Sequence, residues 1–379
     1  MKIIIYILDS FSPNILKGNK SFFFQEKEKN RTFIDKLINK SFYFNNVYGY
    51  GETYSTTYSA IVGKDIYDNY CDAWKLNTSF KLKSNLGSMA KINGFETIYY
   101  RNSGPKSKVD SYFGRYLESI NHNFKYKHLK NKKINDNLYK FIKKNNLLKK
   151  LNSNKKFLIL LHDYSLHDSQ GAYKGSTKGI LNSAKNSADE VKKNLSSLNY
   201  NENKDVLIFF SDHGLTPYPY VKLFNNNFIK KKDYEKYYNK IFVDDKIKML
   251  FFIKIPNLKK KIISKKFLKP KDINIIIRSF FKKDKTLEKI KLLKNIGKQS
   301  ILTSLRSTRA SIYENYFFKN MFHNHLIYID NKKKVVFSNK HSIKYLRSKY
   351  QLDNFKQTYS VPKKLYKFQK KYFSFKNTL

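Results

Sequence analysis

Asp212 and His213 stand side by side at the end of an apolar run that covers residues 206–210, and Gly214 follows them. Five consecutive apolar residues bounded by polar ones predict a buried strand of a parallel sheet. A carboxylate and an imidazole at the end of such a strand are suitable ligands for a divalent metal ion. An Asp-His-Gly sequence on its own is more typical of a strand cap and turn, so the metal interpretation depends on the other strand ends.

Two further apolar runs end in residues of the same types. The run at residues 3–8 is followed by Asp9, and the run at 156–161 is followed by His162 and Asp163, with His167 four residues further on. Because the C-terminal ends of parallel strands meet at one edge of a sheet, where ligands bind, these groups can converge. Such ligands suit zinc or manganese. Two ions about 4 Å apart can bind both the attacking and the leaving oxygen of a displacement at phosphorus.

The segment at residues 49–63 is dense in hydroxyl groups, among them those of Thr53, Ser55 and Thr56. Its second half, residues 58–62, is predicted to be helical and to end at Gly63, a typical C-cap residue. The hydroxyl groups would then lie at a helix N-terminus, where backbone N–H groups and the helix dipole favour an anion. A Thr or Ser hydroxyl coordinated to a metal ion is deprotonated more easily and becomes a nucleophile.

The surrounding pattern predicts the elements that must position these groups. A helix at 184–198 connects two of the buried strands as a βαβ unit, which favours an α/β domain with a mostly parallel central sheet. Residues 326–329 and 335–337 predict a hairpin in a small antiparallel subdomain. We expect a catalytic domain over residues 1–290 and an α+β subdomain over 291–379 that packs on the main sheet and completes the site. Further strands are predicted at 42–47, 95–100 and 249–255, and further helices at 32–38, 86–92 and 272–281.

The chain of 379 residues carries a formal net charge of +47, from 76 Lys and Arg against 29 Asp and Glu. A large positive charge is typical of proteins that bind nucleic acid or membrane surfaces. Here the excess is mostly Lys, spread along the chain together with Asn, Ile, Phe and Tyr, the residues whose codons are rich in A and T. We therefore keep nucleic-acid binding only as a minor alternative.

Cysteine and hydropathy narrow the class of protein further. Cys71 is the only cysteine, which excludes a disulfide framework and a thiolate metal cluster. No segment reaches the roughly 18 apolar residues of a membrane span, and the apolar run at residues 3–8 is too short for a signal peptide. We expect a cytoplasmic protein without a membrane span, and we leave its oligomeric state open.

Four segments, taken in order, resemble the motifs of the alkaline phosphatase superfamily, most closely its sulfatase-like branch, which includes phosphodiesterases and phosphotransferases. They are Ile-Ile-Ile-Tyr-Ile-Leu-Asp-Ser-Phe-Ser-Pro from residue 3, Gly-Glu-Thr-Tyr-Ser-Thr-Thr-Tyr-Ser-Ala-Ile-Val-Gly from residue 51, Asp-Tyr-Ser-Leu-His from residue 163 and Phe-Phe-Ser-Asp-His-Gly from residue 209. The resemblance covers residues 1–280 and, less closely, continues to 340. It implies an alkaline-phosphatase-like three-layer α/β/α fold and a divalent metal, Zn²⁺ or Mn²⁺, as one or two ions.

The resemblance also implies roles for individual residues. Asp9, Asp212 and His213 match the ligands of one metal ion. The family's nucleophile lies ten residues before the Gly that closes its helix; counted back from Gly63, that position is Thr53, with Ser55 and Thr56 as alternatives.

A second group of residues matches the family less specifically. Asp163 and His167 match ligands of a second metal ion, and they match equally well a segment in which the His contacts the substrate anion. A third ligand of the second ion would be a downstream His, either His323 or His325, although both also fit surface positions leading into the hairpin. Lys64 and Arg101 could neutralise substrate charge, but Lys is so abundant here that neither is singled out.

Two departures from the family pattern bear on the chemistry. Sulfatases convert a Cys or Ser to formylglycine within a Cys-x-Pro-x-Arg context, whereas Thr53 is followed by neither Pro nor Arg in that context. Ser10 also replaces the second Asp that is usual in calcium-binding sulfatases. Both departures favour phosphate ester or phosphodiester chemistry.

The sequence therefore predicts a metal-dependent hydrolase or phosphotransferase with a Thr nucleophile. Its substrate would be a phosphate (or sulfate) ester of a small molecule, a glycan or a lipid, as in surface polysaccharide or lipid modification. Two alternatives belong to other classes: a non-catalytic sulfatase-like binding protein and, less favoured, a basic nucleic-acid-binding protein.

Overall fold

The computed structural model describes most of the N-terminal three quarters of the chain and the strands of its C-terminal part. The described residues are 1–19, 21, 24–50, 53–63, 86–102, 120, 123–128, 137–166, 177–214, 247–282, 286–306, 324–331, 333–337, 342–347 and 353–358.

The fold is built around an eight-stranded sheet with the strand order β4-β3-β5-β1-β6-β7-β2-β8. Strand β1 lies inside the sheet and pairs in parallel with β5 on one side and β6 on the other. Of these eight strands, β7 alone runs antiparallel to both of its neighbours. The strands are β1 (Lys2–Leu8), β2 (Phe42–Val47), β3 (Phe95–Arg101), β4 (Tyr126–His128), β5 (Lys156–Asp163), β6 (Val206–Ser211), β7 (Phe251–Lys254) and β8 (Ile262–Leu268).

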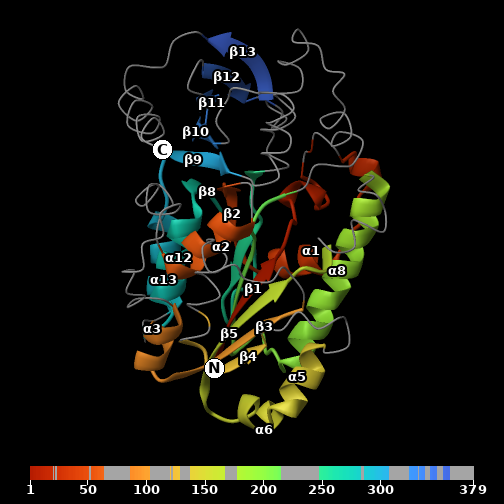
Figure 1. The fold of residues 1–379 in the computed structure, drawn as a ribbon, viewed down its shortest axis with the longest axis vertical. Helices are drawn as coiled ribbons and strands as arrows, with labels where there is room; N and C mark the ends of the chain where they lie inside the picture. The colour runs from red at the N-terminus through yellow and green to blue at the C-terminus, as the bar shows by residue number, and fades with distance from the viewer. Residues whose placement is uncertain are drawn as a thin grey trace.

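Helices cover both faces of this sheet, because both faces of its central strands are apolar. Ile3, Ile5 and Ile7 of β1 belong to one core, and the alternate residues of the strand belong to the other. Figure 1 shows the two helical layers on opposite sides of the sheet. One layer contains α2 (Thr53–Val62), α3 (Leu86–Ile92), α12 (Pro270–Ser279) and α13 (Thr286–Asn295); the other contains α1 (Phe33–Ile38), α5 (Leu138–Lys144), α6 (Leu147–Leu151) and α8 (Thr177–Ser197). Two short 3-10 helices, η1 (Pro13–Ile15) and η2 (Glu26–Glu28), follow β1. This is the predicted α/β architecture of three layers.

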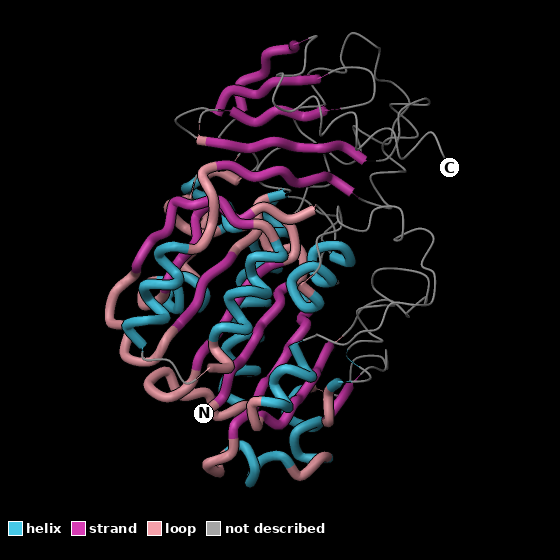
Figure 2. The backbone as a smooth tube through the Cα atoms, turned by 90° about the vertical axis from the view of Figure 1, so that its left-hand side faces the viewer, coloured by secondary structure: helices cyan, strands magenta, loops and turns pink. Residues whose placement is uncertain are grey.

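A second sheet of five antiparallel strands follows in the order β13-β12-β11-β10-β9, and Figure 2 shows it beyond one end of the main sheet. A β-bridge between Phe267 and Lys298 links the approach to this sheet with β8. The predicted hairpin is confirmed, because Leu326 pairs with Phe337. The predicted division at residues 290 and 291 falls inside α13, and that division stays a prediction. The strands are β9 (Ser300–Arg306), β10 (Asn324–Asp330), β11 (Lys333–Phe337), β12 (Ser342–Arg347) and β13 (Asp353–Thr358).

Two predicted boundaries next to the candidate site were wrong. Helix α2 begins at Thr53, five residues before the predicted start, because it packs along α12. Strand β5 continues to Asp163 instead of ending at residue 161, because β1 pairs with it as far as Leu8. No helix among the described residues is long and apolar enough to cross a membrane.

Candidate metal centre and nucleophile

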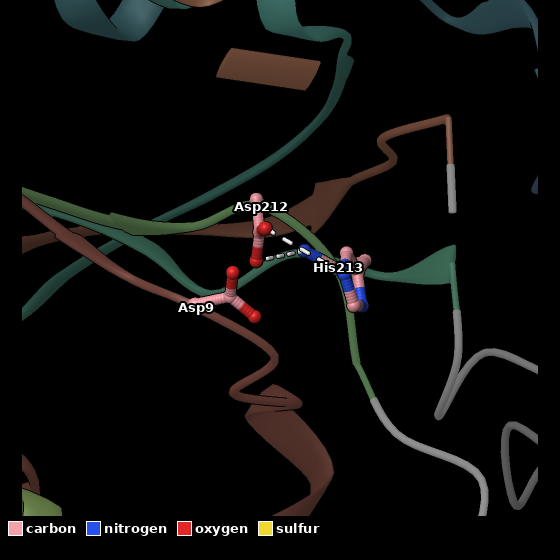
Figure 3. Close-up of side chains that lie close together, drawn as sticks. All are labelled: Asp9, Asp212 and His213. Atoms are coloured by element: carbon pink, nitrogen blue, oxygen red, sulfur yellow. Dashed lines mark hydrogen bonds and ion pairs between the residues drawn. The ribbon is translucent and has the colours of Figure 1, made fainter. Parts of the chain in front are cut away.

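The carboxylates of Asp9 and Asp212 come together at the C-terminal edge of the main sheet. Leu8 and Ser211 are partners in the parallel pairing of β1 and β6, so the residue after each lies at the same level. Because side chains alternate between the two faces of a strand, both carboxylates lie on the face that α2 covers. Both residues are fully buried. Figure 3 shows their side chains converging with that of His213, which follows Asp212 directly. One potential ligand atom from each of these three residues lies within 4.8 Å of the other two.

Thr53, the first residue of α2, brings a hydroxyl group into the same cluster. Its Oγ1 donates a hydrogen bond of 3.0 Å to Asp9 Oδ2 and lies 3.3 Å from His213 Nε2. The loop before α2 passes close to β6: a Cβ at Gly49 would lie 2.7 Å from the Asp212 carbonyl oxygen. A glycine at this position therefore allows the helix to begin beside the two carboxylates.

The donor set and its spacing fit a single divalent ion. Zinc–ligand bonds to oxygen and nitrogen are about 2.0–2.2 Å long, which places neighbouring ligand atoms about 3–3.5 Å apart. His213 Nε2 lies 3.5 Å from Asp212 Oδ2, and that oxygen, although buried, accepts no hydrogen bond from any described residue. His213 Nδ1 is 2.6 Å from the Gly214 carbonyl, so that Nδ1–H donates there and the Nε2 lone pair faces the cluster.

Without an ion the two carboxylates repel one another. Burial, and next the negative charge of Asp9, raise the pKa of Asp212 to about 6, even though His213 and the Ser10 amide act in the opposite direction. Two ionised carboxylates in a buried site are costly unless a cation neutralises them. The electrostatics of the cluster therefore favour a bound cation as much as its geometry does.

Asp163 lies outside this cluster and on the other face of the sheet. It is the register partner of Leu8, whose side chain packs in the core under α8, whereas Asp9 faces α2. Both of its oxygens are occupied: Oδ2 accepts from the Tyr6 hydroxyl, and Oδ1 accepts from Asn102 Nδ2 at 2.7 Å and from the Ser165 amide at 2.9 Å. This satisfied environment is typical of a carboxylate that fastens a loop to the end of a strand.

The other predicted site residues are placed as follows. Thr56 is fully buried, and its Oγ1 accepts a hydrogen bond of 3.2 Å from the Tyr50 amide, so its hydroxyl holds the loop before α2. Ser55 lies on α2 and His325 on β10, and the side chains of both are outside the described part of the structure. His167 and His323 lie outside the described residues altogether.

Of three buried residues on the α2 side of the sheet, the sequence pointed only to Arg101, as a group that could neutralise substrate charge. His162 is the register partner of Ile7 and therefore faces the same side as Asp9; its ring stacks on Tyr164 with centroids 4.4 Å apart. Burial lowers the pKa of His162 to about 3, so the imidazole is neutral at physiological pH. Arg101 of β3, with 2% of its surface exposed, is the register partner of His162. The alternation along β3 and β5 places Arg101 and His162 on this face once the register of the strands is known.

No family model matches the chain, and no curated protein matches it. Solved structures match it over its full length. A putative sulfatase from Bacteroides thetaiotaomicron superposes with a TM-score of 0.60 at 11% sequence identity, covering 100% of this chain and 91% of that one. A protein in the alkaline phosphatase superfamily from Vibrio parahaemolyticus gives a TM-score of 0.59 at 11% identity, with coverages of 100% and 87%.

This chain has the alkaline phosphatase fold. The lipoteichoic acid synthase LtaP from Listeria monocytogenes shares that fold as well, with a TM-score of 0.55, 14% identity and coverages of 100% and 90%. The resemblance drawn from four short motifs is thus confirmed at the level of the fold. Within the alkaline phosphatase fold of this chain, the cluster of Asp9, Asp212, His213 and Thr53 stands where β1, β6 and α2 meet.

Proposed function

We propose that this protein is a metal-dependent enzyme that cleaves or transfers a phosphate or sulfate ester, with Thr53 as the nucleophile. One observation carries the proposal: the Thr53 hydroxyl, at the start of α2, lies 3.0 Å from a carboxylate oxygen and 3.3 Å from an imidazole nitrogen that both belong to a cluster suited to a divalent ion. The solved structures with the same fold include a putative sulfatase and a lipoteichoic acid synthase, which is consistent with ester chemistry.

The proposed reaction has two steps. A divalent ion held by Asp9, Asp212 and His213 would make the Thr53 hydroxyl more acidic and offset the negative charge of the group under transfer. Thr53 Oγ1, already hydrogen-bonded to Asp9 Oδ2, attacks the phosphorus or sulfur atom, and the ester oxygen leaves. Water or an acceptor hydroxyl then attacks the same atom and releases Thr53. The first acceptor gives hydrolysis and the second gives transfer.

We further propose a single ion rather than a pair. Asp163, the residue expected to begin a second site, faces the opposite side of the sheet with both oxygens engaged by protein donors. His167 is then left to the other role expected of it, contact with the substrate anion. The Asp163→Asn variant should bind as many metal ions per chain as the parent protein does.

Phosphate esters and phosphodiesters are the preferred substrate class. Thr53 cannot yield formylglycine, and the Pro and Arg of the formylglycine context are missing after it. A glycan or lipid phosphate ester would fit the positive net charge of +47, which attracts anions over a Debye length of about 8–10 Å.

The decisive experiment replaces Thr53 by Val and by Ser. Val keeps the shape of the side chain but has no hydroxyl group, so we expect turnover of an aryl phosphodiester to fall by roughly 10³-fold or more. Ser keeps the nucleophile and should retain part of the activity. Circular dichroism and elemental analysis of both variants would show that the fold and the metal content persist. Mass spectrometry after an acid quench should find the transferred group on the peptide that contains Thr53.

Each part of the proposal can fail separately. A Thr53→Val variant as active as the parent would remove Thr53 from the nucleophilic role. A protein that binds metal but turns over neither phosphate nor sulfate esters would favour the non-catalytic alternative. Binding to nucleic acid that weakens steeply with salt, without any ester turnover, would favour a basic nucleic-acid-binding protein.

A further inference from the structure

Ser10 has an unusual backbone conformation between Asp9 and the start of the following loop. Its φ is +66°, in the left-handed region that residues other than glycine seldom adopt, and it is fully buried. This conformation turns its amide toward β6, where the N–H donates to Asp212 Oδ1 at 2.8 Å. The hydroxyl of the same residue donates to Asp9 Oδ1 at 2.5 Å. Strained residues of this kind are concentrated at functional sites.

These two hydrogen bonds divide the four carboxylate oxygens of the cluster into two pairs. Asp9 Oδ1 and Asp212 Oδ1 are held by Ser10, and the His213 amide adds a second hydrogen bond of 2.8 Å to Asp212 Oδ1. Asp9 Oδ2 instead faces Thr53 Oγ1, and Asp212 Oδ2 faces His213 Nε2. One oxygen of each carboxylate is thereby occupied by protein donors, and the other faces Thr53 or His213.

We propose that Ser10 is a positioning residue that makes Asp9 and Asp212 each offer a single oxygen to the ion and so selects the metal; this rests on the metal site of the proposed function. Two single oxygens and one imidazole nitrogen form a small mixed donor set, which suits Zn²⁺ or Mn²⁺. Ca²⁺ takes six to eight oxygen ligands and commonly binds carboxylates through both oxygens. An arrangement that withholds one oxygen of each carboxylate discriminates against Ca²⁺.

The test compares Ser10→Ala and Ser10→Gly with a matched control. Both variants lose the hydroxyl and keep the amide, but only glycine also relieves the left-handed conformation. The control is Ser12→Ala, because Ser12 is a fully buried serine two residues away whose hydroxyl accepts from the Asn14 amide and contacts neither carboxylate. Calorimetric titration of each metal-free protein with Mn²⁺, Zn²⁺ and Ca²⁺ measures affinity without reference to activity. The electron paramagnetic resonance spectrum of bound Mn²⁺ reports the change in its coordination.

We expect both Ser10 variants to bind Mn²⁺ and Zn²⁺ about 10–100-fold more weakly than the parent, as is typical when a group that orients a metal ligand is lost. We also expect their preference over Ca²⁺ to shrink and the Mn²⁺ spectrum to change, while Ser12→Ala behaves as the parent. The glycine variant should resist thermal unfolding better than the alanine variant yet lose the same affinity, which separates positioning from folding.

Unchanged affinities and selectivity in both Ser10 variants would overturn the role of Ser10 while leaving the proposed metal site intact. A loss of metal affinity in the alanine variant alone would also overturn the positioning role of Ser10, because that loss would come from backbone strain. A parent protein that binds none of the three ions would overturn both the role of Ser10 and the metal-dependent function.

Discussion

Asp212 is both a proposed metal ligand and a buried carboxylate whose ionisation lowers the stability of the metal-free fold. Burial and the neighbouring Asp9 raise its pKa to about 6, so the folded protein resists the ionised form that a metal ion requires. Below pH 6 a proton neutralises Asp212 in the folded chain, whereas the unfolded chain takes up that proton only near pH 4. Ionisation of Asp212 therefore destabilises the metal-free fold above pH 6, and this cost shrinks as the pH falls toward 4.

The substitution Asp212→Asn should consequently stabilise the metal-free protein. The amide oxygen can still accept from the Ser10 and His213 amides, while the buried negative charge disappears. At pH 7 we expect the free energy of unfolding to rise by about 2–3 kcal/mol, given roughly 1.4 kcal/mol for each unit of the pKa shift. Near pH 4.5 the difference should be much smaller. Denaturant unfolding in the presence of a chelator, at both pH values, measures it; an Asn variant less stable than the parent at pH 7 would contradict this account.

A buried side chain of α12 binds the end of helix α2 that lies opposite Thr53. Asn274, which is buried, donates from Nδ2 to the carbonyl oxygens of Ala60 at 3.1 Å and Ile61 at 2.9 Å. Gly63 ends the helix at φ +82°, and a Cβ there would lie 2.5 Å from Asn274 Oδ1. Asn274 therefore satisfies two of the last carbonyl groups of the helix and holds the helix against α12.

The substitution Asn274→Ala should lower both stability and turnover without affecting metal affinity. Loss of two buried hydrogen bonds leaves carbonyl groups unsatisfied and should cost about 1–3 kcal/mol in the free energy of unfolding. Turnover should fall because Thr53 is less well positioned, whereas the metal ligands lie at the ends of β1 and β6 and should bind as before. Ser279→Ala on the same helix is the control, because its hydroxyl donates only to Ile276. Equal turnover in the two variants would exclude a positioning role for Asn274.

The elements that follow local patterns were predicted well from the sequence. β2 and α3 have the predicted bounds, because three consecutive aromatic residues at the start of a strand and the Asn93-Gly94 pair after a helix are both local signals. The start of α2 was missed because residues rich in hydroxyl groups have a weak helix propensity, and packing on α12 overrides it. The antiparallel direction of β7 could not be predicted, because the apolar pattern of a strand does not depend on its direction in the sheet.

The candidate site was predictable to the extent that it depends on strand ends. Asp9, Asp212 and His213 do meet, because the general rule that parallel strands end at one edge is enough to bring them together. Asp163 lies on the other face because it is level with Leu8 and not with Asp9. This register depends on pairing between segments that are distant in the sequence. For the same reason the alternation that places His162 on the α2 face could be interpreted only once the register was known.

Across the whole molecule, the fold matches those of solved structures although the sequences share little identity. Matches at 10–14% identity cover most or all of this chain, although no family model recognises it. The chain is rich in Lys, Asn, Ile, Phe and Tyr. The polar residues at its strand ends follow the order of the motifs described from the sequence.

Metal binding should be detectable as a property of the whole molecule. An ion that binds the folded chain alone, at about 100 times its Kd, should stabilise the fold by about 2.7 kcal/mol. Thermal unfolding of chelator-treated protein, with and without added Mn²⁺ or Zn²⁺, measures this effect. The Asp212→Asn variant should not respond, because one of the proposed ligands is gone. An unfolding temperature of the parent that no divalent ion changes would speak against a resident metal.

Strand β5 presents His162 to one side of the sheet and Asp163 to the other, so two polar assemblies lie back to back across a single thickness of backbone. On one side Tyr6, Asn194 and Asp163 are joined by hydrogen bonds and fasten the sheet to α8. On the other side stand the groups proposed to react. The hydrogen bonds that stabilise the fold and the groups proposed to react therefore lie on opposite faces of one sheet. Substitutions that strengthen the first face can leave every side chain of the reactive cluster in place.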